Sequence, residues 1–283
     1  MTAMSPAFQR RLRPVLLTVG SLAILIYALF PFYWMLTVSI IPEQKFFARE
    51  VHFFPTEMTI NNYINLFQVL PFAKYFRNSS IVAISTVLVT LVLAIPAAYA
   101  FARFRFRGRR PLLTGLLLLY MIPPVVLLVP LLLTFRNLQL INTFVGLILA
   151  ESTGTIPFGI WMLVNYFVAL PRELDDAALV DGCSPLGALI RVILPLSLPG
   201  VLAAGLFIFI VTWNNFLFAF LFASGEEVKT LPVVMRSFVR GESGVFWGLI
   251  MASATVTTLP VALVFLFFQK YLIGALASGS VKG

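Results

Sequence analysis

The chain has 283 residues, of which 60% are hydrophobic and 11% charged, and its formal net charge is +9. Soluble domains average about 45–50% apolar and about 25% charged residues, so most of this chain must use lipid as its solvent. A single cysteine, Cys183, excludes an intramolecular disulfide, and the single histidine, His52, excludes most histidine-based metal sites.

Six apolar runs free of Asp, Glu, Lys and Arg are long enough to cross a bilayer, which takes about 20 residues. They cover residues 14–42, 78–102, 111–135, 152–171, 192–225 and 243–269. The runs are continuously apolar, which excludes a membrane β-barrel, whose strands alternate with period two. We therefore expect an all-α polytopic membrane protein. Its six transmembrane helices are predicted at about 15–40, 78–102, 111–135, 142–171, 196–223 and 247–272.

The basic residues collect in segments that such a topology places on one side of the membrane. Arg10, Arg11 and Arg13 precede the first helix, and five arginines lie within 103–110. Cytoplasmic loops carry an excess of Lys and Arg. We therefore expect the N-terminus, the loop 103–111, the segment 171–195 and the C-terminus in the cytoplasm. A nucleic-acid patch is the alternative explanation of the charge. The first apolar run is too long for a signal peptide, so we expect an uncleaved helix.

The first half of the chain offers two further structural expectations. Residues 59–62 have the composition of a turn and helix cap, and predict a short half-apolar helix over 63–70 on the membrane surface. In the third helix, Pro123, Pro124 and Pro130 remove backbone donors, which lipid tolerates only where protein or a wet cavity satisfies the freed carbonyls. This helix is therefore a candidate pore wall or a kinked packing helix.

Two polar groups interrupt the later helices and are candidates for lining a translocation pathway. Glu151 lies inside the predicted fourth helix, where a carboxylate must face a cavity or a partner, or else lie near the boundary in water. Trp213, Asn214 and Asn215 lie inside the fifth. The side-chain amides of Asn214 and Asn215 either hold helices together or contribute to a polar substrate path.

The segment 171–195 interrupts the apolar pattern and contains four of the eleven acidic residues. Pro171 is placed to open a helix and Gly182 to close it. Ser184 and Pro185 then predict a new helix start, and Pro195 is expected to stop that second helix. This is the pattern of a docking element outside the membrane.

The same segment resembles the EAA loop of permease subunits of binding-protein-dependent ABC importers. That loop has Glu-Ala-Ala, three residues, Gly, nine residues, Ile, one residue and Leu-Pro. Here 176–178, Gly182 and 194–195 match the spacing, with Asp176 in place of Glu and Val192 in place of Ile. Residues 59–63, the end of the second helix, 213–216 and the tail 278–283 also look like carbohydrate permeases of the maltose type, most like their smaller, six-helix partner.

The resemblance implies a single permease domain over 1–283, with a core at about 76–272 to which the helix 15–40 is added. It implies a non-enzymatic subunit that moves sugar by alternating access. It also implies that the short helices of 171–195 dock on a separate ATPase. The implied coupling residues are Glu173, Asp175, Asp176, Ala177, Ala178, Asp181, Gly182, Leu194 and Pro195. Asn214 and Asn215 are implied to line the pathway or pack beside it, and Glu151 and Trp213 remain candidate pathway residues.

The partners that the resemblance implies are a second, different permease, an ATPase dimer, an extracytoplasmic sugar-binding protein that meets the loop 224–246, and membrane lipid. ATP and Mg are expected on the ATPase, so no cofactor or metal is expected on this chain. The expected location is a bacterial or archaeal plasma membrane. Glycerol phosphate or another polyol is an alternative substrate, although phosphate would favour basic residues that the apolar runs lack. An ion-coupled transporter is a further alternative, for which only Glu151 qualifies as a coupling group.

Overall fold

The computed structural model describes residues 6–45, 53–55, 57–69, 71–240 and 244–280, with side chains omitted at 6–13, 44, 69, 239–240, 244–245 and 272–280. His52 and residues 281–283 of the tail 278–283 lie outside the described residues. Backbone proximity divides the chain into two compact units. One comprises residues 1–70 and 238–256, and the other comprises 71–237 and 257–283.

The first unit consists of short elements at the end of one long apolar helix. Its elements are α1 (Pro6–Ser39), η1 (Glu43–Lys45), α2 (Asn61–Val69), the antiparallel pair β1 (Val239–Arg240) and β2 (Gly244–Val245), and the start of α13 (Trp247–Ser280). The helix expected at 63–70 is thus confirmed as α2. Asn62 donates its amide hydrogens to the carbonyl oxygens of Ser39 and Ile41, both at 2.9 Å, and so ties α2 to the end of α1.

Glu43 connects η1 to the start of α13 through a hydrogen bond. Its Oε2 accepts a hydrogen bond from the backbone N–H of Gly248 at 3.1 Å. Burial raises the pKa of Glu43 above its ordinary value, and the backbone hydrogen bonds from Gly248 and Trp247 oppose that rise. The carboxyl therefore keeps its proton to a higher pH in the folded chain than in the unfolded one.

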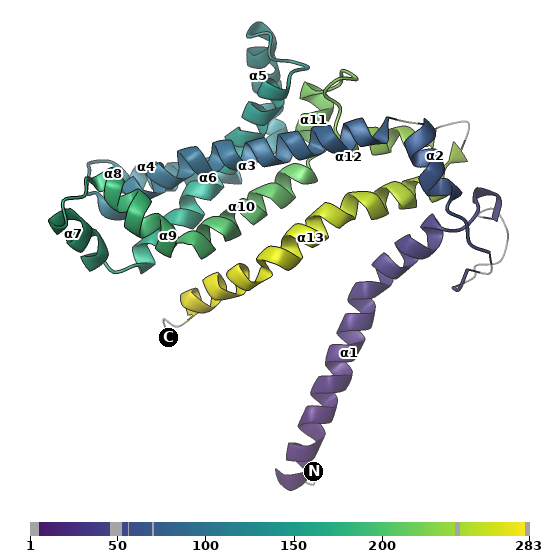
Figure 1. Ribbon diagram of the computed structural model, residues 1–283, viewed down its shortest axis with the longest axis horizontal. Coiled ribbons are helices and arrows are strands. Elements are labelled where there is room, and N and C mark those ends of the chain that lie inside the picture. The colour runs from purple at the N-terminus through teal and green to yellow at the C-terminus, as the bar shows by residue number, and fades with distance from the viewer. Residues whose placement is uncertain (1–5, 46–52, 56, 70, 241–243, 281–283) are drawn as a thin grey trace. The chain divides into compact units, whose positions relative to one another are not determined.

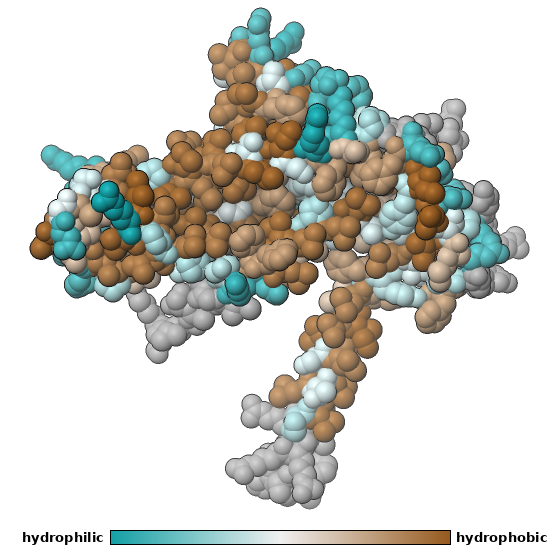
Figure 2. Space-filling model, viewed as in Figure 1, coloured by the Kyte–Doolittle hydropathy of each residue, from teal (hydrophilic) through white to brown (hydrophobic). Residues whose placement is uncertain are grey.

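The second unit holds the long helices and the expected docking segment. Its elements are α3 (Phe72–Arg103), α4 (Arg109–Met121), α5 (Pro124–Asn137), α6 (Phe144–Ala169), α7 (Glu173–Val180), α8 (Pro185–Ala188), the π-helical turn η2 (Leu189–Ile193), α9 (Leu194–Leu196), α10 (Leu198–Trp213), α11 (Leu217–Phe222), α12 (Leu231–Met235), most of η3 (Arg236–Phe238) and the rest of α13. Helices α3, α6 and α10 lie side by side (Figure 1). Hydrophobic residues cover their visible face (Figure 2), as a lipid-facing surface requires.

The close packing of α3 on α6 depends on small residues. Ala94, Ala98 and Ala102 on α3 are almost fully buried. A Cβ added to Gly159 of α6 would lie 3.2 Å from Thr90 and 3.4 Å from the Cβ of Ala94. Small side chains let helix backbones approach within van der Waals contact, which replaces the hydrophobic effect as the source of helix association in lipid.

Within the described part of the chain, four single helices are long and apolar enough to span a membrane, at 14–39, 72–103, 144–169 and 247–271. Two bent helix pairs pass the same test, 109–137 with a bend of 95° and 185–213 with a bend of 79°. The all-α fold with six spans is therefore confirmed when each bent pair counts as one span. Two details of the expected helices are wrong.

The third expected helix is not one kinked rod but the two helices α4 and α5. Ile122, between them, has an extended backbone with φ −67° and ψ 125°. The Cδ of a proline clashes with a helical residue before it, so Pro123 forces this conformation, and Pro124 then starts α5. Two consecutive residues without an N–H therefore give a sharp bend instead of a kink.

The fifth expected helix also starts and ends differently. Pro195 does not stop the helix that begins at Pro185, because the π-helical turn η2 precedes it and the Leu194 N–H bonds five residues back to Leu189 O. The wider turn accommodates the proline ring, and the break falls instead at Ser197. At the other end α10 stops at Trp213, and residues 217–222 form the separate helix α11.

Candidate coupling surface and buried polar site

The docking segment folds into two short helices because its local signals agree. Glu173, Asp175 and Asp176 lie in the first turn of α7, where carboxylates stabilise the positive end of the helix dipole. Gly182 has φ +85°, a left-handed conformation, and the Cys183 N–H bonds to Ala178 O at 2.9 Å, closing α7. The Ser184 hydroxyl accepts from the Gly187 N–H at 3.1 Å and caps α8.

One face of α7 is exposed along its whole length. Glu173, Asp176, Ala177 and Val180 are all exposed, and their spacing of three, one and three residues places them on one helical face. Val180, at 88% exposure, lies at the C-terminal end of this face. We call these four residues the α7 face. Val180 was missed from the sequence, although its spacing from Asp176 and Ala177 points to it.

The other expected coupling residues lie elsewhere. Ala178 is buried beneath α7, Leu194 is half-buried, and Asp181, Gly182 and Pro195 are exposed. Asp175 is buried within the chain: its Oδ1 accepts from the Tyr99 hydroxyl at 2.7 Å, and its Oδ2 lies 2.8 Å from Arg103 Nε. The two acids that follow one another at 175 and 176 therefore point to opposite sides of the helix.

Glu151 is buried inside the bundle at 3% exposure and faces a partner within the chain. Its Oε2 accepts a hydrogen bond from Asn215 Nδ2 at 2.8 Å. The Oδ1 of Asn215 in turn accepts from the N–H groups of Leu217 at 3.0 Å and Phe218 at 3.3 Å. The amide thus caps α11 and joins it to α6, so Asn215 has a structural role at the break after α10.

A small cavity of about 10 Å³ adjoins this carboxylate. The hydroxyls of Thr212 and Thr230, which line it, are buried and have no hydrogen-bond partner among the described residues. A single water molecule needs roughly 10–15 Å³ and two to four polar partners. The cavity therefore has the size and chemistry for one water molecule, and it is far too small for a sugar.

The side chain of Trp213 is buried, whereas that of its neighbour Asn214 is exposed. Trp213 donates its indole N–H to Thr257 O at 3.1 Å and stacks on Phe209 with ring centroids 5.5 Å apart. Asn214 is exposed and donates to Ile210 O, one turn back in its own helix, at 2.8 Å. Of the four expected pathway residues, Asn214 alone is exposed.

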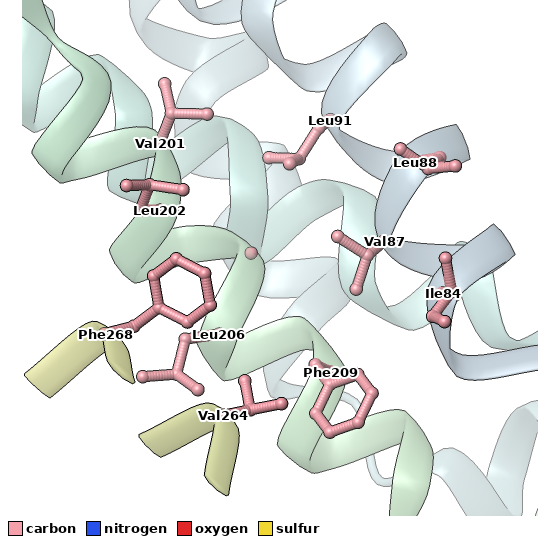
Figure 3. A pocket seen from close by; sticks show the side chains of 11 residues that line it. Ile84, Val87, Leu88, Leu91, Val201, Leu202, Leu206, Phe209, Val264 and Phe268 are labelled. Atoms are coloured by element: carbon pink, nitrogen blue, oxygen red, sulfur yellow. The ribbon is translucent and has the colours of Figure 1, made fainter. Parts of the chain in front are cut away.

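A larger pocket of about 200 Å³ lies among α3, α10 and α13 (Figure 3). The residues that line it are all apolar: Ile84, Val87, Leu88, Leu91, Val201, Leu202, Gly205, Leu206, Phe209, Val264 and Phe268. Sugar sites place polar groups against the ligand hydroxyls. This pocket offers none from its lining side chains, so it suits hydrocarbon and not a sugar.

The loop that follows α11 is packed down on α3 through residues 227–231. Asn78 donates to the carbonyl oxygens of Glu227 and Lys229, both at 2.9 Å, and Ser79 Oγ accepts from the Leu231 N–H at 2.9 Å. Glu226 beside them bonds to Lys229 and to the Tyr75 hydroxyl, and these hydrogen bonds lower the pKa of Glu226. The loop therefore has a defined conformation on this helix.

Replacement of Glu151 tests its structural role. Glu151→Gln keeps an oxygen for the Asn215 amide and is expected to change the free energy of unfolding little. Glu151→Leu leaves that amide unpaired and is expected to cost about 1–3 kcal/mol. Unfolding in mixed detergent micelles measures both variants, and equal stability of the two would show that the hydrogen bond contributes nothing.

Comparison with known proteins places the fold and the docking segment in a family. Residues 90–277 match the family described as "Binding-protein-dependent transport system inner membrane component". Since this match covers most of the chain, the protein belongs to that family and is a multi-pass inner-membrane transport component. The boundaries 1–283 and 76–272 expected for its domain remain predictions.

Individual relatives match over almost their whole length. The trehalose/maltose transport system permease protein MalG of Thermococcus litoralis is 34% identical over 96% of this chain and 98% of its own. The diacetylchitobiose uptake system permease protein DasC of Streptomyces coelicolor is 33% identical over 94% and 96%. A solved bacterial ABC transporter that imports the acidic polysaccharide alginate has a TM-score of 0.81 at 22% identity, over 96% and 99%, which supports the fold.

Proposed function

We propose that this chain is the transmembrane permease subunit of an ATP-driven ABC importer for a di- or oligosaccharide, and that it forms half of the translocation pathway. The observation that carries the proposal is the α7 face, which presents two acids, an alanine and a valine on a helix with the spacing of a coupling loop. The names of the relatives, which include trehalose/maltose, diacetylchitobiose and sulfoquinovosyl glycerol systems, support a carbohydrate substrate.

The proposed partner of the α7 face is a separate ATPase subunit. Ala177 keeps the centre of this face slim enough to enter a groove, and Val180 offers an apolar contact at its end. Asp176, exposed at the positive end of the helix, is placed to pair with a basic group of the ATPase. ATP and Mg belong to that subunit. Among the described residues, no three His, Cys, Asp or Glu side chains gather into a metal site.

The other proposed partners follow from the same assembly. A second, different permease supplies the other half of the pathway, and lipid covers the remaining apolar surface. An extracytoplasmic sugar-binding protein meets the loop 224–246. The arginines of 103–110 and the N-terminal basic residues support a cytoplasmic location for α7 and both termini, in a bacterial or archaeal plasma membrane.

The alternative substrates are weighed by the groups that face the bundle interior. An anionic glycerol phosphate favours recognition by Arg or Lys, and the apolar runs of this chain contain neither. Hydroxyl and amide groups suit a neutral sugar, with Asn214 as the exposed candidate. An ion-coupled mechanism would need Glu151 to change its proton or ion state during transport.

Uptake into proteoliposomes that contain the assembled importer tests the proposal. We expect sugar uptake to require ATP, to need the binding protein and to persist in Glu151→Gln. Uptake without ATP, driven by an ion gradient and lost in Glu151→Gln while assembly is intact, would establish the ion-coupled alternative. Labelled glycerol phosphate serves as the comparison substrate, and its preferential uptake would overturn the sugar assignment.

A further inference from the structure

A buried ion pair and hydrogen bond join α7 of the docking segment to the end of α3. Asp175 on α7 meets both Tyr99 and Arg103, which lie one turn apart on α3. The side chains of Arg103 and Asp175 are only 7% and 11% exposed. A charge pair at this burial is desolvated, so removing one partner leaves the other without compensation.

Arg103 also holds the backbone on which α7 begins. Its Nη1 donates to Leu170 O at 3.1 Å and its Nη2 to Pro171 O at 3.5 Å. Its Nε lies 2.8 Å from Asp175 Oδ2, off the N–H axis, so this third contact is an attraction between charges more than a directed hydrogen bond. The Arg103 guanidinium therefore contacts both the junction between α6 and α7 and the first turn of α7.

Packing around the cluster restricts its motion. The Tyr99 ring stands edge-on to Phe167 of α6, with centroids 6.4 Å apart, and edge-on to Phe104, at 5.9 Å. Arg172, just before α7, returns a contact by donating to Ala102 O at 3.5 Å. Since side chains in close-packed interiors occupy few rotamers, the cluster behaves as a stiff joint.

The chain connections of α7 are turns and a helix break. It is joined to α6 through the extended residue Leu170 and to α8 through Gly182 in its left-handed turn. Beyond α8, the path to α10 passes through the π-helical turn η2 and the 79° bend. α7 also packs on α8 and η2, but the path from there to α10 crosses a helix break, and helix breaks are where hinge motions are absorbed.

We propose that Tyr99, Arg103 and Asp175 form the joint through which a displacement of α7 is passed to α3, so that α3 moves with α7 as one rigid body. Asp175 is then a positioning residue within this chain, and the ATPase contact belongs to the α7 face. This inference rests on the proposed coupling function.

The assembled importer tests it with Asp175→Asn, Arg103→Gln and Arg103→Lys. We expect Asp175→Asn and Arg103→Gln to keep the ATPase bound while sugar transported per ATP hydrolysed falls by about fivefold or more. Arg103→Lys keeps the charge and should recover part of that ratio. Arg107→Gln, which removes an exposed arginine from the same loop, is the matched control and should leave the ratio unchanged.

A second measurement does not depend on the ATPase. In the permease without ATPase, hydrogen exchange of the α7 amides is expected to quicken about tenfold in Asp175→Asn and Tyr99→Phe, because the joint no longer holds the helix. Unchanged exchange and unchanged coupling would overturn the joint. Loss of the ATPase from Asp175→Asn would instead make Asp175 a partner contact. Failure of the unaltered chain to bind any ATPase would refute the proposed function while exchange still reports on the joint.

Discussion

Asp176→Arg is expected to remove the ATPase from the purified importer while the permease itself stays folded. Asp176 is exposed on α7, and no hydrogen bond or ion pair of its side chain is described, so its replacement leaves the bundle intact. In the proposed complex it faces a basic group, and reversal replaces an attraction with a repulsion. Contacts of this kind are worth at least about 2 kcal/mol, or roughly a thirtyfold change in affinity.

Co-purification at several salt concentrations measures this effect. Glu227→Arg, a reversal at an acid whose side chain is 84% exposed on the loop after α11, is the matched control and should retain the ATPase. Gly182→Asp is a second variant, since a side chain at φ +85° strains the turn that orients α7 against α8. Retention of the ATPase at the unaltered yield by both α7 variants would show that this surface is not the coupling site.

Gly200→Ala is expected to destabilise the helical bundle, although alanine is ordinarily the better helix former. An added Cβ would lie 2.4 Å from Cδ2 and 2.5 Å from Cγ of Tyr166 on α6. Real Cβ atoms do not approach this closely, so α10 or the ring must shift. Overpacking of a close-packed core costs about 1–3 kcal/mol, more than the roughly 1 kcal/mol gained from helix propensity.

Unfolding in mixed micelles measures the change against two further variants. Gly115→Ala on α4 has open space around the new Cβ and is the control, expected to be neutral or slightly stabilising. Tyr166→Ala combined with Gly200→Ala removes the ring that the Cβ meets, and the pair should be less destabilised than the sum of the single changes. Strict additivity would show that the contact with Tyr166 is not the cause.

The residues whose role is local were predictable from the sequence. Continuous apolar runs have no other stable environment than lipid, and that physical constraint alone gives the all-α class and the approximate spans. Likewise the caps at Ser184 and the left-handed turn at Gly182 depend only on backbone chemistry within a few residues. The docking segment 171–195 could therefore be recognised, and its two short helices follow from its own signals.

The bends were less predictable, because a proline in the sequence restricts the backbone but does not specify the angle between the helices on either side of it. Pro195 was expected to end a helix, yet a π-helical turn accommodates it. At Pro123 and Pro124 the chain turns by 95°. Neither the π-helical turn nor the size of the bend follows from the prolines alone.

By itself the sequence determined the solvent of this protein, the number of its spans and the two short helices of the segment 171–195, since these follow from composition and short-range backbone chemistry. Only the tertiary structure decided which of two adjacent acids faces inward. Consecutive helical residues point about 100° apart, so the assignment depends on where α3 ends: Arg103 and Tyr99 draw Asp175 inward and leave Asp176 exposed. The environment of Glu151 was also decided only by the tertiary structure, because its partner Asn215 lies 64 residues away in the chain.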